Sequence, residues 1–320
     1  MIEHQEGAEL VALADPLFAE QPCDWPSLRE KSFESAEAML AATGEQVDVV
    51  SICTPNGTHA ELAMLAMNHG CHVVIEKPVA LNSDDVRQIQ AVAKAQGVKV
   101  FGVMQNRYAP AAQWLKQSMQ DGLVGDVLQV HVQCLWNRDE RYYQPGSWRG
   151  TMALDGGPLF TQFSHFLDIL MWVFGRPVVR DAHFVNQAHQ STTEFEDGGM
   201  VRLDMPGGAW GTFTFSTAVA DQNFESSLTV LGTKGSFRIG GQYMDRLDEF
   251  MVEGVERPTM AKPSPANDYG AYKGSAANHH HVYANVMGVL NHGDAIATPI
   301  EDGLAVVEVI EEMHRLGRRS

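Results

Sequence analysis

The stretch His72–Val79, HVVIEKPV, decides the fold because an apolar run in it ends abruptly in charge. Val73–Ile75 is uninterrupted by polar residues, which is typical of a strand buried on both faces of a parallel sheet. Glu76, Lys77 and Pro78 then stand at the carboxyl end of that strand, the edge at which open α/β sheets bind ligands. We expect Lys77 to belong to a binding or catalytic site, the alternative being a solvated surface lysine.

Strand and helix patterns alternate on both sides of this stretch. Asn82 supplies an N-cap and Gly97 a stop for the helix between them, so the ends of that helix are well marked. Such alternation is typical of βαβ units in a parallel sheet, and hence of an α/β fold. The sequence predicts strands at Leu10–Asp15, Val47–Ile52, His72–Glu76 and Lys99–Met104, and helices at Ser35–Ala42, Thr58–His69 and Ser83–Gln96.

The pattern changes after about residue 106, and strands dominate the middle of the chain. We predict a Rossmann domain at 1–106 and, at 107–320, an α+β domain with a mostly antiparallel sheet. The last two helices either stay with the second domain or pack back on the first. The expected elements are helices at Pro110–Gln120, Pro158–Phe174, Asn278–Leu290 and Gly303–Leu316, a strand at Asp126–Leu135, an irregular loop at Trp136–Gly150 and several strands within His183–Ile239.

The first residues depart from the usual dinucleotide-binding pattern. A sheet of this kind begins with a strand, a GxGxxG turn and a helix, because the glycines let the pyrophosphate approach the backbone. No such turn precedes Leu10, while Asp15 stands where the acid that holds the adenosine ribose belongs. We therefore expect an N-terminally truncated Rossmann sheet with a gap in place of its central strand. Either the true start lies upstream or the product is impaired.

Composition excludes several classes of partner. The 320 residues include 40 acidic and 23 basic side chains, and the formal charge of −17 disfavours binding to nucleic acid and to anionic membranes. The longest apolar run, Leu167–Phe174, is too short to span a bilayer. The four cysteines show no CxxC spacing and follow no secretory signal, so we expect reduced, buried thiols in a cytoplasmic protein.

Three stretches in order carry a family resemblance. They are Cys53–His59 (CTPNGTH), Glu76–Pro78 (EKP), and Gly156-Gly157 followed by His165 and Asp168. Together they resemble the Gfo/Idh/MocA (glucose-fructose oxidoreductase, inositol dehydrogenase) family. The resemblance implies a Rossmann domain, a second domain with a large open sheet that carries the substrate site, and NAD- or NADP-dependent oxidation of sugars or cyclitols. It also implies a homo-oligomer, which we expect to be a dimer or a tetramer.

The expected chemistry needs a base and a cation at one hydroxyl, since a proton leaves the oxygen as a hydride leaves the carbon. Lys77 and His165 fit those roles, and which of them is the base stays open. On a single helix, Thr161, His165 and Asp168 share one face, so Asp168 is expected to orient the imidazole. Many family members carry an acid at the position of Thr161, whose hydroxyl cannot accept a proton at neutral pH, so we expect the proton relay to rest on Lys77 and His165.

The expected cofactor is NAD, because Asp15 repels the 2′-phosphate of NADP. His59 opens a helix and either touches a ribose or caps that helix. The expected cofactor-binding residues are Asp15, Thr54, Pro55, Asn56, His59, Glu76, Lys77 and Gln105.

A narrower resemblance concerns the substrate. Trp148-Arg149-Gly150 and Asn267–Ser275, followed by Asn278-His279, resemble the WlbA-type branch, which oxidises the 3-hydroxyl of UDP-N-acetylglucosaminuronic acid for surface-polysaccharide synthesis. The alternatives are a dehydrogenase of another sugar or cyclitol, and a non-catalytic sugar- or dinucleotide-sensing protein. Arg107 is expected either to bind a sugar carboxylate or to order a loop. The expected substrate contacts are Arg107, Trp148, Arg149, Thr161, Tyr269, Tyr272, Lys273, Ser275, Asn278 and His279.

The run His279-His280-His281 could suggest a metal-binding site. Consecutive residues of a helix point about 100° apart, and no cysteine or carboxylate stands at ligand spacing nearby. We therefore expect no metal.

Overall fold

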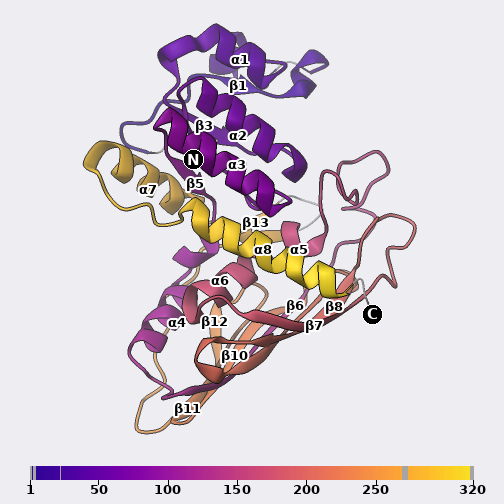
Figure 1. Cartoon of the computed structure of the whole chain (residues 1–320), viewed down its shortest axis with the longest axis vertical. Helices are drawn as coiled ribbons and strands as arrows, with labels where there is room; N and C mark the ends of the chain where they lie inside the picture. Colours follow the sequence, from indigo (N-terminus) through magenta and orange to yellow (C-terminus); the bar gives the residue numbers. More distant parts are fainter. Residues whose placement is uncertain (1, 3–4, 22, 269–272, 318–320) are drawn as a thin grey trace. The chain divides into compact units, whose positions relative to one another are not determined.

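The computed structural model describes residues 2, 5–21, 23–268 and 273–317. It divides into two units (Figure 1): Met1–Val103 with His279–Leu304, and Met104–Asn278 with Ala305–Ser320. The first unit thus ends three residues before the predicted boundary at 106 and takes in a segment from near the end of the chain.

Short parallel strands form the sheets of the first unit. One sheet has the order β3-β4-β5, and the pair β1-β2 forms a separate two-stranded sheet. The predicted parallel sheet is confirmed, and its strands form two separate sheets. The bounds are β1 Leu13–Ala14, β2 Ser32–Phe33, β3 Val49–Ile52, β4 His72–Ile75 and β5 Val100–Gly102.

Helices flank these strands, and α3 has the predicted bounds Ser83–Gln96. The side chain of Asn82 accepts from the amide of Asp85, and Gly97 adopts the left-handed conformation with φ of 68°. Both expected helix signals are therefore present. The other helices here are α1 Ala36–Thr43, α2 His59–Asn68 and α7 His279–His292, with 3₁₀ turns η2 Pro16–Ala19, η3 Pro26–Lys31, η4 Gly44–Gln46 and η5 Asn56–Thr58.

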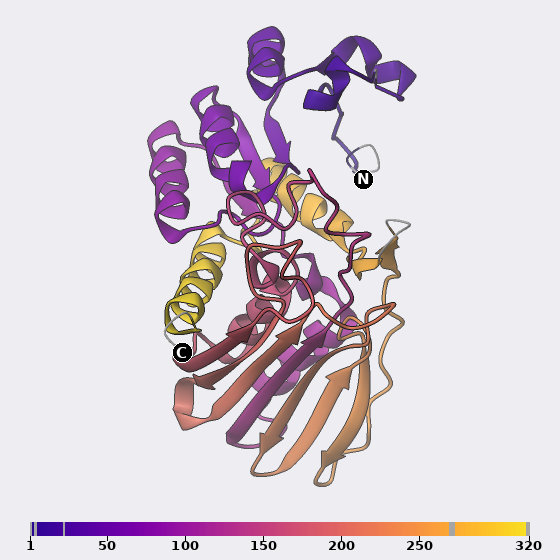
Figure 2. The ribbon, with the colours of Figure 1, turned by 90° about the vertical axis from the view of Figure 1, so that its right-hand side faces the viewer.

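A seven-stranded sheet dominates the second unit (Figure 2), in the order β12-β11-β10-β6-β9-β8-β7. Neighbouring strands are antiparallel except β6 and β9, which pair in parallel, so the sheet is mostly antiparallel as predicted. The bounds are β6 Val127–Leu135, β7 Val178–Val185, β8 Gly198–Asp204, β9 Trp210–Ser216, β10 Glu225–Gly232, β11 Gly235–Gly240 and β12 Arg246–Val252, with a separate pair β13 Ala266–Asp268 and β14 Lys273–Ala276.

Helices cover one face of this sheet. The ring of Trp114 on α4 lies 4.9 Å from that of Phe237 on β11, and His314 on α8 lies 5.7 Å from Phe184 on β7. Side chains alternate along each strand, so the other face carries residues such as the 44% exposed Trp210. The helices are α4 Pro110–Gln120, α5 Pro158–Thr161, α6 Ser164–Phe174 and α8 Ile300–Gly317, with 3₁₀ turns η6 Gln105–Tyr108 and η7 Pro206–Gly208.

The predicted single helix Pro158–Phe174 is wrong, because two helices, α5 and α6, replace it. The carbonyl oxygen of Pro158 accepts from the amides of both Gln162 and Phe163, each at 2.9 Å, and this wider closure ends the first helix. Thr161 therefore lies on α5, whereas His165 and Asp168 lie on α6. The argument that all three share one face of one helix does not hold.

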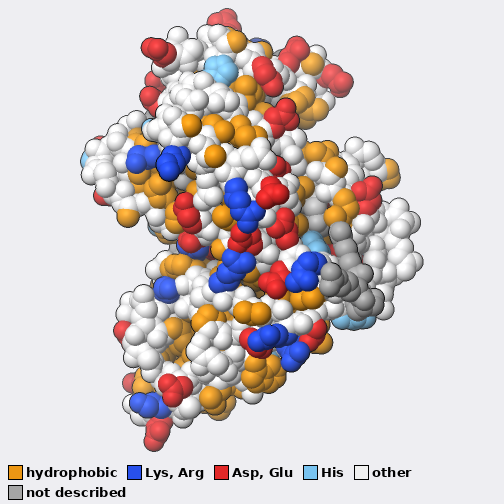
Figure 3. Space-filling model, viewed as in Figure 1, with side chains coloured by type: hydrophobic (Ala, Val, Ile, Leu, Met, Phe, Trp, Pro, Cys, Tyr) orange, Lys and Arg blue, Asp and Glu red, His pale blue; other side chains and the backbone are white. Residues whose placement is uncertain are grey.

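All four thiols are free, but Cys53 is exposed, which corrects the prediction that all four are buried. Cys53 lies just beyond the end of β3, where the backbone leaves the sheet. No helix in the described part of the chain is long and apolar enough to cross a membrane. Acidic and basic side chains are interspersed on the face drawn in Figure 3. Any anionic ligand therefore depends on a local cluster of donors.

Candidate functional site

The first group of candidate residues lies at the carboxyl edge of β3 and β4. Ile52 and Ile75 are register partners at the ends of these strands, so the turns that follow begin at the same edge of the sheet. Thr54 lies in the first turn, where its hydroxyl is 2.7 Å from that of Thr58. Lys77 lies in the second turn and is half-buried. The edge predicted from HVVIEKPV is thus present.

His59 is fully buried at the start of α2. Its Nδ1 lies 2.7 Å from the carbonyl oxygen of Pro78 and its Nε2 lies 2.9 Å from that of Thr54. Both ring nitrogens therefore face protein acceptors, and neither points to a ribose. Burial lowers the pKa of His59, with Lys77 acting in the same direction and both carbonyls and Glu76 opposing it.

Glu76 and His279 form a pair that the sequence does not reveal. His279 Nε2 lies 3.4 Å from Glu76 Oε1, and Glu76 Oε2 accepts from the amide of Lys77 at 3.3 Å. Burial acts to raise the pKa of Glu76, but the hydrogen bond and charge of His279, together with Lys77, lower it below 4.5. His279, expected at the substrate, thus contacts the proposed cofactor edge.

Ser51 and Tyr283 also meet at this edge, and sequence reasoning missed both. The Tyr283 hydroxyl lies 2.5 Å from Ser51 Oγ. Burial, with smaller effects from the charges of Cys53 and Glu76, raises the pKa of Tyr283 to about 12. Tyr283 follows His279 by four residues on α7, so both side chains lie on one face of that helix. This spacing is the sequence signal that could have identified Tyr283.

Other candidate residues of the first unit, in two separate sheets, also have the chemistry expected of a dinucleotide site. Asp15 follows β1, where a carboxylate can accept from ribose hydroxyls, although one oxygen already caps η2 by accepting from the amide of Leu17 at 2.9 Å. Pro55 precedes η5, and Asn56 is 5% exposed. These residues, with Thr54 and Glu76, offer the polar groups that we expect at a dinucleotide site.

The second group of candidates lies within the second unit, around His165 on α6. Its Nε2 is 3.3 Å from the side-chain amide nitrogen of Gln105, and each residue is 2% exposed. An amide nitrogen only donates, so with the Gln105 side chain in this orientation Nε2 of His165 accepts. Gln105, expected at the cofactor, thus contacts the candidate base.

Arg107 and Asp168 form a buried, bidentate ion pair. Arg107 Nε lies 2.8 Å from Asp168 Oδ2, and Nη2 lies 2.5 Å from Oδ1, with the two side chains 6% and 2% exposed. The guanidinium also lies 5.5 Å from the ring of Trp172. A protein carboxylate thus occupies the fork that we expected to bind a sugar carboxylate or to order a loop.

Thr161 donates its hydroxyl to the carboxylate of Asp155, which is fully buried. The other oxygen of Asp155 accepts from the amide of Gly150 at 2.9 Å. Gly150 has φ of +89°, and a Cβ there would lie 2.5 Å from the carbonyl oxygen of Thr192, so glycine is required. Thr161, expected at the substrate, therefore ties the loop of Arg149 to α5. Sequence reasoning missed Asp155.

A stack of arginines and aromatic rings surrounds Arg149. Its guanidinium carbon lies 4.6 Å from the ring of Tyr142 and 4.9 Å from that of Trp148. Arg138 lies 5.1 Å from the same Tyr142 ring, and Gln162 donates to the Tyr142 hydroxyl at 2.9 Å. Two positive charges thus lie close to one ring, and cation–π attraction holds the guanidinium of Arg149 near Tyr142 and Trp148.

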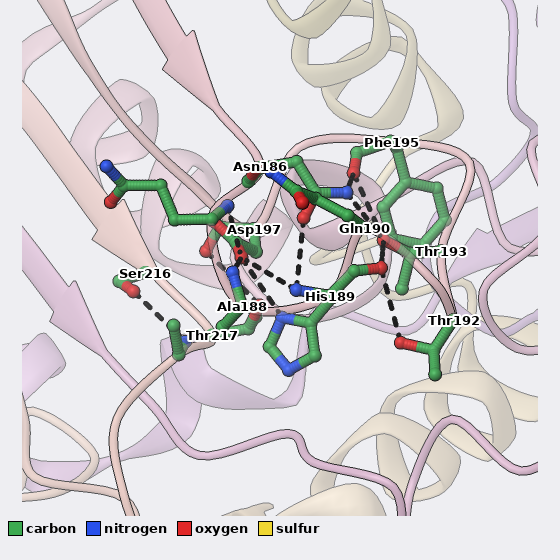
Figure 4. Close-up of polar contacts among 12 residues, drawn as sticks. Asn186, Ala188, His189, Gln190, Thr192, Thr193, Phe195, Asp197, Ser216 and Thr217 are labelled. Carbon is green, nitrogen blue, oxygen red and sulfur yellow. Dashed lines mark hydrogen bonds and ion pairs between the residues drawn. The ribbon is translucent and has the colours of Figure 1, made fainter.

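A second loop supports this region (Figure 4). The Oδ2 atom of Asp197 accepts from the amides of Gln187 at 2.9 Å and Ala188 at 2.5 Å, and His189 Nδ1 lies 3.3 Å away. The amide of Glu194, in the same loop, donates to the carbonyl of Gly150 at 2.9 Å. The loop that Asp197 organises therefore holds the chain next to Arg149.

The remaining expected substrate contacts lie on or near β13 and β14. Tyr269 and Tyr272 fall outside the described residues. Lys273 and Ser275 belong to β14, but the structure describes only their backbone. Asn278 is 1% exposed. In the described part of the chain, no three His, Cys, Asp or Glu side chains gather in a way that could hold a metal ion.

Two family models match the chain. Residues 1–103 match the model described as an oxidoreductase family with an NAD-binding Rossmann fold. Residues 112–238 match the GFO/IDH/MocA C-terminal domain.

Solved structures resemble almost the whole chain. The WlbA dehydrogenase from Bordetella pertussis, in complex with NADH and UDP-GlcNAcA, is 30% identical with a TM-score of 0.83, over 98% of this chain and 89% of that one. The WlbA dehydrogenase from Chromobacterium violaceum, in complex with the same two ligands, is 28% identical with a TM-score of 0.85, over 99% and 88%. Among curated proteins, trans-1,2-dihydrobenzene-1,2-diol dehydrogenase from Mus musculus is 27% identical over 291 residues, which cover 89% of this chain and 81% of that protein.

Proposed function

Because the chain belongs to the Gfo/Idh/MocA family of NAD-binding oxidoreductases, we propose that it oxidises the 3-hydroxyl of UDP-N-acetylglucosaminuronic acid in surface-polysaccharide biosynthesis. The observation that carries the proposal is the likeness to two WlbA dehydrogenases, both in complex with NADH and UDP-GlcNAcA, over 98% and 99% of the chain. The stack around Arg149 supports an anionic substrate, since a guanidinium matches phosphate and carboxylate oxygens.

Lys77 is the proposed cation of the reaction. It follows Val73–Ile75, the fully buried part of β4, and its amide donates to the carboxylate of Glu76 at 3.3 Å. An ammonium beside the sugar hydroxyl lowers the pKa of that alcohol and orients it for proton removal. NAD, when bound, accepts the hydride.

His165 is the second proposed catalytic residue, as base or as proton relay. Its Nε2 acts as an acceptor toward Gln105, so the same atom can take a proton from a hydroxyl that displaces the amide. Arg107 and Gln105 lie on one 3₁₀ turn, and Asp168 and His165 on one helix. The Arg107–Asp168 pair therefore supports the Gln105–His165 contact, and we also propose that Asp168 orients the imidazole.

Purified chain with NAD and a panel of UDP-sugars, free sugars and cyclitols tests the proposed substrate. We expect NADH to form fastest with UDP-N-acetylglucosaminuronic acid. A faster rate with a free sugar or cyclitol would support the second candidate, a different dehydrogenase of the family. Calorimetric binding of a sugar or of NAD with no turnover would support a non-catalytic sensor.

We further propose that the protein is a cytoplasmic homo-oligomer, a dimer or a tetramer. The free thiols are consistent with a reducing compartment. The uncovered sheet face carries Met200 and Trp210, which are 48% and 44% exposed, and apolar residues on such a face favour association. Light scattering of the wild type and of Trp210→Arg tests this. A monomeric wild type would exclude the oligomer.

A further inference from the structure

Two turns carry the candidate groups of the first unit, and one side chain joins them. The last backbone hydrogen bond between the ends of β3 and β4 runs from the amide of Glu76 to the carbonyl of Ile52, at 3.0 Å. Beyond it, the chain leaves β3 into the turn at Thr54 and leaves β4 into the turn at Lys77 and Pro78. His59 bridges these two turns through its contacts with the carbonyls of Thr54 and Pro78.

The chemistry of these contacts makes His59 a tie rather than a ligand for a sugar or cofactor. Carbonyl oxygens only accept, so a ring nitrogen 2.7 or 2.9 Å away is held there by donating a proton. A neutral imidazole donates to one carbonyl, and an imidazolium donates to both. Full burial of the side chain leaves no edge of the ring for another partner.

We propose that His59 is a positioning residue that holds the Pro78 carbonyl against the Thr54 carbonyl and so fixes the backbone from which Lys77 projects. Lys77 immediately precedes Pro78, so a shift of the Pro78 carbonyl moves the start of the Lys77 side chain. The charged groups that face His59 are Glu76 and Lys77. The consequence for turnover rests on the proposed function, whereas the positional claim does not.

The test measures the reactivity of Lys77 in the whole 320-residue protein. Acetic anhydride modifies neutral amines, so the rate of Lys77 acetylation against pH, read by peptide mass spectrometry, gives the midpoint of its titration. In His59→Phe, which keeps a buried ring but removes both nitrogens, we expect that midpoint to move by about one pH unit. The exposed Lys94 is the internal reference, and its profile stays unchanged.

His69→Phe is the matched control. His69 is exposed at the end of the same helix, where its Nδ1 contacts the Leu65 carbonyl at 3.0 Å. A folded His59→Phe with the wild-type Lys77 midpoint would overturn the proposal. If His59→Phe does not fold, His59→Leu decides, because it fills the buried position with an apolar side chain that cannot donate to either carbonyl. A wild-type Lys77 midpoint in that variant also overturns the proposal.

Turnover separates this inference from the proposed function. We expect kcat of His59→Phe to fall about tenfold or more while KM for the sugar changes little, because substrate contacts remain and the catalytic group is displaced. A chain that oxidises no sugar but shows the shifted Lys77 midpoint keeps the positioning role and loses the dehydrogenase. Oxidation of the sugar by His59→Phe with an unshifted Lys77 midpoint would keep the dehydrogenase and overturn the positioning role of His59.

Discussion

Asp168 binds Arg107 through both of its carboxylate oxygens, at 2.8 and 2.5 Å, with both side chains almost fully buried. The pair joins η6 to α6, and those two elements carry Gln105 and His165. The acid that helical spacing predicts to orient His165 therefore also neutralises a buried arginine. Its loss has consequences for stability as well as for chemistry.

Asp168→Asn is expected to destabilise the second unit by about 3–5 kcal/mol, because it removes that anion from a buried guanidinium. Urea unfolding followed by tryptophan fluorescence measures this, since Trp25 is the one tryptophan of the six outside residues 104–278. The control is Asp181→Asn, whose partner Arg202 lies 2.6 Å away in a pair that is 57% and 55% exposed. That change should cost less than about 1 kcal/mol, and equal losses in the two variants would contradict the argument.

Gly150→Ala is expected to destabilise the loop before Asp155 and to weaken substrate binding. The new Cβ meets the Thr192 carbonyl at 2.5 Å and must also adopt φ of +89°. Gly146→Ala is a matched control, because its φ is +79° but no atom lies within 4 Å of the Cβ. The difference in unfolding midpoint between the two variants isolates the close approach. Equal midpoints would show that Thr192 imposes no restriction.

Glu76 gives the stability a defined pH dependence. Although burial acts to raise it, the pKa of Glu76 in the folded chain lies below 4.5 because of His279 and Lys77. A group whose pKa is lowered by folding contributes stability above its unfolded pKa and loses it as pH falls through the folded value. The thermal midpoint of wild type minus that of Glu76→Gln should therefore stay constant from neutral pH to about 4.5 and shrink below. In a His279→Asn background, the difference in thermal midpoint should depend less on pH. An unchanged pH dependence would contradict the pairing of His279 with Glu76.

Arg149→Ala is expected to raise the Kd for UDP about 10- to 100-fold, since a charge-assisted hydrogen bond contributes about 1.5–3 kcal/mol. Arg149→Lys should recover little of this loss, because an ammonium has no planar fork of donors to offer two phosphate oxygens at once. Calorimetry with UDP measures both without any need for turnover. Arg257→Ala is the control: this arginine contacts the carbonyls of Leu247 and Asp248, and its loss should leave UDP binding unchanged.

The local rules of the chain made much of the fold predictable. Asn82 and Gly97 bound α3, and Pro110 begins α4, so both helices have their predicted limits. The break between α5 and α6 was not predictable. Its cause is the carbonyl of Pro158, which accepts hydrogen bonds from the amides of both Gln162 and Phe163, and the spacing of apolar residues gives no sign of such backbone hydrogen bonds. The same holds for the parallel pairing of β6 with β9, which join distant parts of the sequence.

For the candidate site too, local sequence patterns reveal some residues, whereas contacts made by folding determine the roles of others. Lys77 stands out in the sequence because a charged turn follows an apolar strand, a local pattern. The partners of His59, Thr161 and Asp168 depend on which segments folding brings together. A histidine that opens a helix looks the same in sequence whether it caps the helix, binds a ribose or ties two turns, so the sequence leaves the role of His59 open.

NADH formation with UDP-N-acetylglucosaminuronic acid, in the wild type and in Lys77→Met, tests the central claim most directly. We predict turnover in the wild type, a loss of about 10²–10⁴-fold in kcat for Lys77→Met, and wild-type activity in the control Lys94→Met, whose lysine is exposed on α3. Undiminished turnover in Lys77→Met would contradict the account.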